Sequence, residues 1–157
     1  MPDWLTHSLI GWITGKATKL DVGLLALGAL LPDISKLMLL FNWVFNRDLD
    51  KLFYPIHTPI GALLIACIIA LFFEEQKKAL LFLGIGITTH FILDLFLLNV
   101  SGGTTLLFPF SWNEWQLNLI RSDDYSMTIL AIIAAMIVYL IYNFFEKKRK
   151  THKEKNT

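Results

Sequence analysis

A histidine and an aspartate stand four residues apart in the segment His90-Phe91-Ile92-Leu93-Asp94. Residues i and i+4 of a helix share one face, so an imidazole nitrogen and a carboxylate oxygen can approach the same cation. The same spacing also allows a buried structural pair, in which Asp94 accepts a hydrogen bond or a proton from His90. The segment therefore predicts either half of a metal site or a structural pair.

Three more residues offer the same kinds of donor atom: His7, Asp33 and His57. Asp33 follows a proline and also suits the first turn of a helix, where the helix dipole favours an acidic side chain. His57 precedes Thr58 and Pro59, which are typical of a helix cap and a first helical residue, so His57 can be a boundary residue. His7 lies among apolar residues, where a lone histidine often has a structural role.

These five residues share a ligand chemistry that suits particular metals. Imidazole nitrogens and carboxylate oxygens without a thiolate favour a divalent metal, with Zn²⁺ as the first candidate and Mn²⁺ as the second. Cys67 is the only cysteine, so the chain has no intramolecular disulfide and no multi-cysteine metal site. The rival interpretation is that the five residues align by chance.

The elements that position these side chains are expected to be membrane helices. Apolar residues make up 55% of the 157 residues and charged residues only 17%, below the roughly 25% of soluble domains. Three long apolar runs reach the length of about 20 residues that crosses a bilayer. They extend from Leu52 to Phe73, from Ala79 to Leu98 and from Tyr125 to Phe145.

Two shorter apolar segments precede these runs. Trp4 to Gly15 and Val22 to Leu31 predict helices about half a bilayer long, and Ile34 to Phe45 either extends the second one or lies at the interface. The predicted fold is an all-α, multi-pass transmembrane helical bundle with short N-terminal membrane-embedded helices. We expect a single domain over residues 1–146 and a basic, disordered cytoplasmic tail over residues 147–157.

The distribution of basic residues predicts an orientation in the cell membrane. The tail from residue 147 onward and the turn with Lys77 and Lys78 should be cytoplasmic, because basic loops remain inside. That basic tail follows a membrane span directly, so we interpret it as a membrane anchor and expect no nucleic-acid partner. This topology brings the five polar residues together toward the outer face.

Five short segments, in this order and spacing from Trp4 to Trp112, resemble the YdjM-like family of membrane-bound metal-dependent hydrolases. The segments are Thr6-His7-Ser8, Gly28-Ala29-Leu30-Leu31-Pro32-Asp33-Ile34, His57-Thr58 followed by Gly61-Ala62-Leu63, His90-Phe91-Ile92-Leu93-Asp94, and Leu107-Phe108-Pro109-Phe110-Ser111. The resemblance implies a small multi-pass helical hydrolase with a distant tie to the zinc phospholipase C and P1 nuclease group.

The resemblance also implies a ligand set on the matching positions of this chain: His7, Asp33, His57, His90 and Asp94. Asp33 and Asp94 would act as oxygen ligands, or one of them as the general base of catalysis. One position departs from the family pattern, because Leu52 stands where an additional histidine often precedes the one matching His57. This departure puts a complete multinuclear site in doubt.

The function predicted from these observations is a metal-dependent hydrolase that uses metal-activated water on a phosphoester of a lipid or prenyl phosphate. Its expected partners are membrane lipids and a lipid-like phosphoester substrate. One alternative is a non-catalytic membrane protein whose metal or polar cluster is structural. Another is a small ion-coupled transporter, because histidines and aspartates inside spans also form proton relays.

Overall fold

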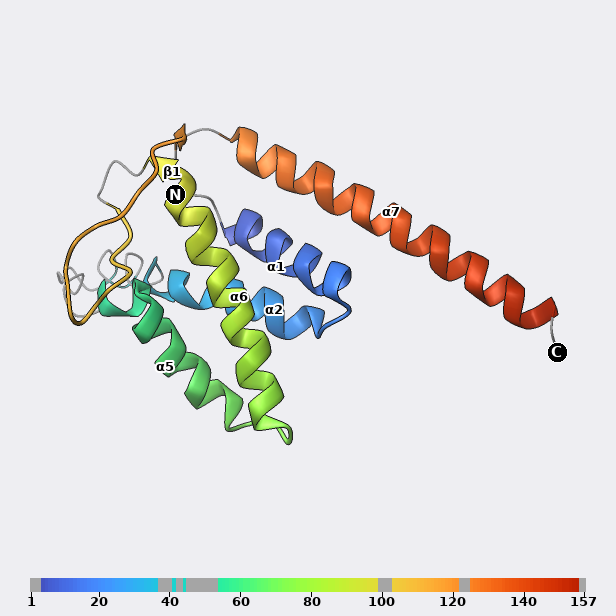
Figure 1. Ribbon diagram of the computed structural model, residues 1–157, viewed down its shortest axis with the longest axis horizontal. Coiled ribbons are helices and arrows are strands. Elements are labelled where there is room, and N and C mark those ends of the chain that lie inside the picture. Colours follow the sequence, from blue (N-terminus) through green and yellow to red (C-terminus); the bar gives the residue numbers. More distant parts are fainter. Residues whose placement is uncertain are drawn as a thin grey trace.

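The computed structural model is mainly helical and confirms the all-α class (Figure 1). It describes residues 4–36, 41, 44, 54–98, 103–121 and 125–155, with side chains described as far as residue 148. Most of the predicted extension from Ile34 to Phe45 lies outside this part of the chain, as does Leu52. The helices and short strands are α1 (Trp4–Thr18), α2 (Val22–Leu30), the 3₁₀ helices η1 (Leu31–Lys36) and η2 (Tyr54–His57), α5 (Pro59–Ala70), α6 (Gln76–Phe96), β1 (Leu97–Leu98), β2 (Ile120–Arg121) and α7 (Ser126–Lys155).

α1 and α2 form a short antiparallel hairpin, as the two short apolar segments predict. α1 continues beyond the expected end at Gly15, because Gly15 serves close packing and does not terminate the helix. A Cβ atom at Gly15 would lie 2.8 Å from the Cα of Val22. α2 begins at a capping aspartate, where the carboxylate of Asp21 accepts a hydrogen bond of 2.9 Å from the backbone N–H of Leu24.

Glycines also allow α2 to pack closely against α6. A Cβ atom at Gly28 would overlap the backbone of Leu83, and one at Gly86 would overlap the backbone of Leu25. Small residues at such crossings are typical of helices that associate within a membrane. The crossing places the C-terminal half of α2 beside the middle of α6, from Leu83 to His90.

α5 packs on α6 through a stripe of alanines that follows the helical period: Ala62, Ala66 and Ala70. The helix is shorter than the predicted span from Leu52 to Phe73, because Pro59 occupies its first turn and the preceding described residues form η2. The predicted cap is confirmed, since the Thr58 hydroxyl accepts a hydrogen bond of 3.1 Å from the N–H of Gly61.

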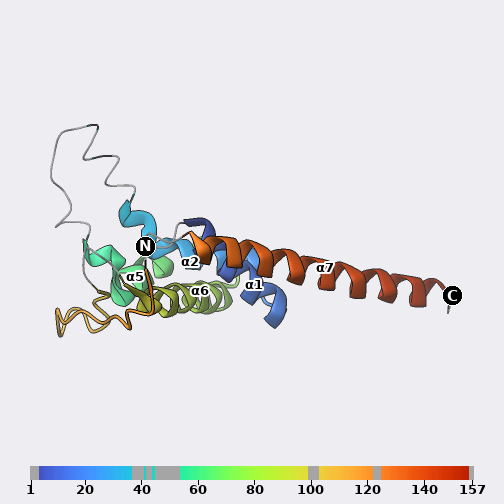
Figure 2. The same ribbon diagram turned by 90° about the horizontal axis from the view of Figure 1, so that it is seen from above.

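Two of the described helices, α6 and α7, are long and apolar enough to cross a membrane. α7 lies along α1, where the hydroxyls of Thr6 and Thr128 are 3.0 Å apart, and then projects beyond the other helices (Figure 2). Its helix continues to Lys155, through the segment expected to be a disordered tail. The reason is local: this segment contains neither proline nor glycine and consists mainly of strong helix formers.

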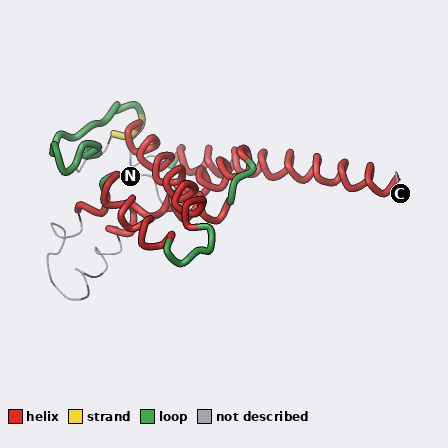
Figure 3. The backbone as a smooth tube through the Cα atoms, turned by 60° about the horizontal axis from the view of Figure 1, so that its bottom comes forward, coloured by secondary structure: helices red, strands yellow, loops and turns green. Residues whose placement is uncertain are grey.

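Residues 103–121 form a long loop beside the end of α6 (Figure 3). Thr104 and Trp115 pair in an antiparallel bridge, and β2 then pairs with β1 in parallel. The indole ring of Trp112 stacks on the ring of Tyr54 in η2 at a centroid distance of 6.2 Å. The loop is therefore attached to the element that ends at His57.

Candidate metal centre

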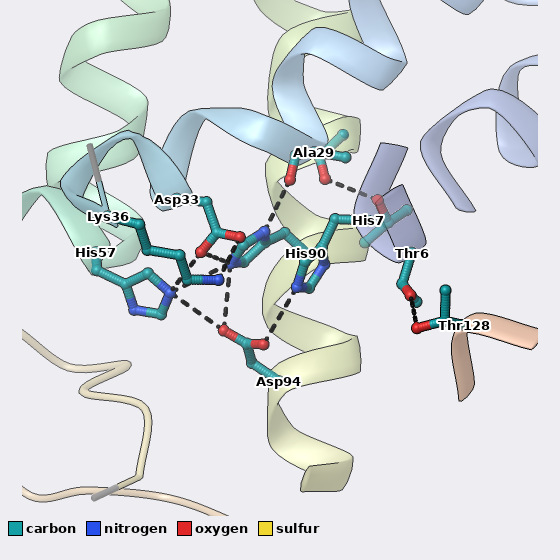
Figure 4. Close-up of polar contacts among 11 residues, drawn as sticks. Thr6, His7, Ala29, Asp33, Lys36, His57, His90, Asp94 and Thr128 are labelled. Atoms are coloured by element: carbon teal, nitrogen blue, oxygen red, sulfur yellow. Dashed lines mark hydrogen bonds and ion pairs between the residues drawn. The ribbon is translucent and has the colours of Figure 1, made fainter. Parts of the chain in front are cut away.

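Four elements bring the five predicted ligand residues together at one place (Figure 4). His7 comes from α1, Asp33 from η1, His57 from η2, and His90 and Asp94 from one face of α6. Four of these residues are at most 1% exposed, and only the side chain of His57 is partly open, at 14%. A cluster of this kind inside an apolar helical protein is expensive and indicates a function.

The ring nitrogens and carboxylate oxygens face one another. The Nε2 atom of His90 lies 3.2 Å from Asp94 Oδ2 and 3.3 Å from the Nε2 of His57. The Nε2 of His57 is also 3.2 Å from Asp94 Oδ2 and 3.5 Å from Asp33 Oδ1. On the other side, the Nε2 of His7 lies 3.5 Å from Asp94 Oδ1, and its ring stacks on that of His90.

Several of these buried atoms lack a hydrogen-bond partner among the described residues. They are both ring nitrogens of His7, Oδ1 of Asp33 and both carboxylate oxygens of Asp94. Buried polar atoms are nearly always satisfied, and these carboxylate oxygens meet imidazole nitrogens only in contacts of 3.2–3.8 Å, so a shared partner between them would complete the set. A cation fits this requirement, because all of these atom types are metal ligands.

The second ring nitrogen of His90 is held in a way that is typical of a metal ligand. Its Nδ1 lies 2.7 Å from the carbonyl oxygen of Ala29, which can only accept a hydrogen bond, so Nδ1 carries the hydrogen. The Nε2 lone pair is then directed into the cluster. In a 3₁₀ turn the carbonyl of Ala29 would accept a hydrogen bond from the backbone nitrogen of residue 32. Residue 32 is a proline and has no N–H, so this carbonyl is available to His90.

A lysine completes the centre on its open side. The ammonium of Lys36 lies 2.6 Å from Asp33 Oδ2, and its side chain is 20% exposed. Lys36 and His57 are the only partly exposed side chains of the cluster. The sequence reasoning missed Lys36, although its spacing of three residues from Asp33 on a helical turn was a signal that could have revealed it.

Neighbouring charges shift the pKa values of His57 and Asp33, the two ligand candidates that lie in short 3₁₀ helices outside the candidate membrane spans. Burial disfavours the charged form of His57, but the carboxylates of Asp33 and Asp94 outweigh burial and raise the pKa of His57 to about 9. Burial alone would raise the pKa of Asp33, but its contacts with His57 and with Lys36, together with the charge of His90, lower it. The two carboxylates thus favour positive charge between Asp33, His57 and Asp94.

The five residues form two overlapping groups of potential ligands. One consists of His7, His90 and Asp94, and the other of Asp33, His57 and His90; within each, the ligand atoms lie within 4.8 Å of one another. The two carboxylates are balanced by Lys36 and by a protonated His57, so a divalent cation would bind in place of the His57 proton. The residues present therefore fit a divalent metal.

The fold and the cluster define a class: a small helical membrane protein with a buried histidine and aspartate centre. The chain belongs to the YdjM family of inner membrane proteins, whose family model matches residues 3–150. The predicted family resemblance is thereby confirmed as far as membership and the membrane are concerned. Searches of curated proteins and of solved structures give no significant match.

Proposed function

We propose that this chain is a membrane-bound metal-dependent hydrolase that cleaves a phosphoester of a lipid or prenyl phosphate. The observation that carries the proposal is the convergence of three histidine nitrogens and two carboxylates on one buried space. A purely structural metal site would be closed, with every ligand position filled by protein. Here the side chains of His57 and Lys36 are partly exposed, which supports access for water and substrate.

The donor atoms favour Zn²⁺, with Mn²⁺ as the alternative. When bound, the metal would lower the pKa of a water to ~7 and polarise a phosphoryl oxygen. His7, His57 and His90 would hold the metal through nitrogen atoms, and Asp94 would hold it through oxygen, because the Asp94 carboxylate faces all three rings.

Asp33 and Lys36 have different roles on the open side. Asp33 contacts Lys36 and His57, the two partly exposed side chains, and would act as the general base that takes the proton of the attacking water, although these contacts lower its pKa and weaken it as a base. The ammonium of Lys36 is held by Asp33 Oδ2 and neutralises the phosphoryl oxygens as charge develops on them. Asp33 would thus accept the proton of the water, and the neighbouring Lys36 would neutralise the negative charge on the phosphoryl oxygens.

An apolar groove next to Asp33 supports a lipid as the substrate. It has a volume of about 220 Å³ and is lined by side chains of α1, α2 and η1. Trp4, Leu27, Leu30 and Ile34 form its walls, and Asp33 lies at its edge. The apolar chain of a lipid phosphoester would fit this groove, which lies next to the cluster at Asp33.

A structural ion-pair cluster is the second candidate, because Lys36 and a protonated His57 can balance the charges of Asp33 and Asp94 without a metal. Metal content distinguishes the two. The protein should be purified in detergent as wild type, as His90→Ala/Asp94→Ala and as His152→Ala, which changes a histidine of the basic C-terminal segment. Elemental mass spectrometry then gives the metal content of each.

We expect about one metal per chain or more in the wild type and the His152→Ala control, and none in the double variant. Phosphate release from phosphatidic acid and headgroup release from phosphatidylglycerol would then identify the class of phosphoester. Absence of metal from the wild type, even after incubation with Zn²⁺ or Mn²⁺, would favour the ion-pair cluster. Metal without hydrolysis of any lipid phosphoester would contradict the proposed activity.

A further inference from the structure

A second cavity lies between the C-terminal end of α1 and the later turns of α7, away from the metal centre. Its volume is about 510 Å³. Val138, Ile141 and Phe145 of α7 form an apolar wall, while Lys16 and Lys19 line it from the α1 side. The cavity therefore combines an apolar surface with two cationic side chains.

Lys16 is directed toward this cavity by aromatic rings. Its ammonium lies 4.2 Å from the ring centroid of Tyr142, which also lines the cavity, and 5.7 Å from that of Trp12. Such cation–π contacts orient an ammonium but leave its full positive charge in place. The charge is thus held at the wall and remains able to attract an anion.

Lys19 adopts a backbone conformation that is unusual for its residue type. It follows the last residue of α1 with a φ of 60°, and the N–H of Leu20 closes the turn on the carbonyl of Gly15 at 3.2 Å. Glycine is the usual residue at this position, because a side chain is strained there. Lys19 in this conformation strains the backbone, but it adds a cationic side chain to the cavity.

The position along α7 defines the depth of the cavity. Glu146, Lys147 and Lys148 follow this apolar wall, where the uncharged part of α7 ends. This is the level of lipid headgroups, with the acyl chains extending along the preceding apolar turns. Glu146 also lines the cavity; its carboxylate would repel a bare phosphate but can accept a hydrogen bond from a hydroxyl.

We propose that this cavity binds one anionic phospholipid with a hydroxylated headgroup, of the phosphatidylglycerol type. The phosphate lies between Lys16 and Lys19, the headgroup hydroxyl donates to Glu146, and an acyl chain covers Val138 and Ile141. The lipid would connect α1 with α7, in which Ala131 and Ala135 are the only buried residues among its described side chains.

Native mass spectrometry of the full chain in detergent tests this site with phosphatidylglycerol and phosphatidylcholine as probes. We expect the wild type to retain phosphatidylglycerol at least ten times better than phosphatidylcholine. Lys16→Gln/Lys19→Gln should lose this preference. The matched control Lys77→Gln/Lys78→Gln removes two charges in the first turn of α6, outside the cavity, and should keep the preference.

Two single variants separate binding from folding. Ile141→Trp fills the apolar wall, keeps both lysines and should weaken phosphatidylglycerol retention about tenfold. Lys19→Gly relieves the backbone and should weaken retention while the helix content by circular dichroism stays unchanged. Equal loss in the Lys77→Gln/Lys78→Gln control, or equal retention of both lipids by the wild type, would overturn the proposal. Metal content serves as an independent readout and should be the same in all variants.

Discussion

His90 has one ring nitrogen 2.7 Å from the Ala29 carbonyl and the other 3.3 Å from the ring of His57. The first contact assigns the hydrogen to Nδ1, so Nε2 offers a lone pair to the shared space. A backbone carbonyl therefore contributes to the centre, although it has no signature in the sequence. Lys36 contributes as well, through its ion pair with Asp33. At the scale of single residues, the centre consists of the five ligand candidates and these two supporting groups.

The stability of the protein should depend on the metal through Asp94. The change Asp94→Asn preserves the shape of the side chain but removes the charge that faces three histidines. We expect chelation of the wild type with EDTA to lower its Tm by about 5–10 °C, since a ligand that binds only the folded state stabilises it by about 3 kcal/mol at a hundredfold excess over Kd. The Asp94→Asn variant should show no such shift. Thermal unfolding followed by circular dichroism measures both, and an EDTA-insensitive wild type would contradict a metal centre.

Lys36 should affect turnover and leave metal binding intact. Lys36→Met retains the length of the side chain but removes the charge proposed to neutralise the phosphoryl oxygens. We expect kcat for a lipid phosphoester to fall about 10²-fold, with partial recovery in Lys36→Arg, because removing a donor to a developing oxyanion has an effect of this size. Metal content should equal that of the wild type. If Lys36→Met loses the metal, Lys36 is a structural partner of Asp33 and does not act on substrate.

Two glycines of α6 provide a matched test of the element packing that positions the centre. A Cβ atom at Gly86 would overlap the backbone of α2, whereas one at Gly84 would meet no atom within 4 Å. Gly86→Ala should therefore destabilise the protein by about 1–3 kcal/mol. Gly84→Ala should be neutral or stabilise it by about 0.5–1 kcal/mol, because alanine favours a helix. Because His90 lies one turn after Gly86, Gly86→Ala should also reduce metal content. Equal Tm values for the two variants would exclude this close packing.

The helices were predictable to the extent that local signals define them. Thr58 and Pro59 predicted the start of α5, and the short apolar segments predicted α1 and α2. Hydropathy alone could not show that Gly15 is a packing residue, because its contact with Val22 of the next helix depends on how the two helices pack. Nor could it show that α5 is too short for a span or that α7 extends through the basic segment. The five ligand candidates were predictable because their side chains are unusual in apolar segments, whereas Lys36 resembles an ordinary surface lysine.

At the scale of the whole molecule, the candidate metal centre lies away from the lysines in the first turn of α6 and from those in the late turns of α7. The centre lies at the C-terminal end of α6, where Trp112 of the long loop stacks on Tyr54 beside it. Lys77 and Lys78 precede the apolar part of α6, and Lys147 and Lys148 follow that of α7. The positive-inside rule then predicts that the basic end is cytoplasmic and that the centre is directed outward.

Cysteine labelling in intact cells tests this orientation. In a Cys67→Ser background, Asn113→Cys places a thiol in the long loop near the centre, and Lys77→Cys places one at the basic end; both positions are exposed. A membrane-impermeant maleimide should label Asn113→Cys in intact cells, whereas Lys77→Cys should react only after the membrane is permeabilised. The reverse pattern would place the centre on the cytoplasmic side, where it would meet phosphoesters of the inner leaflet. The labelling therefore decides which leaflet can supply the substrate.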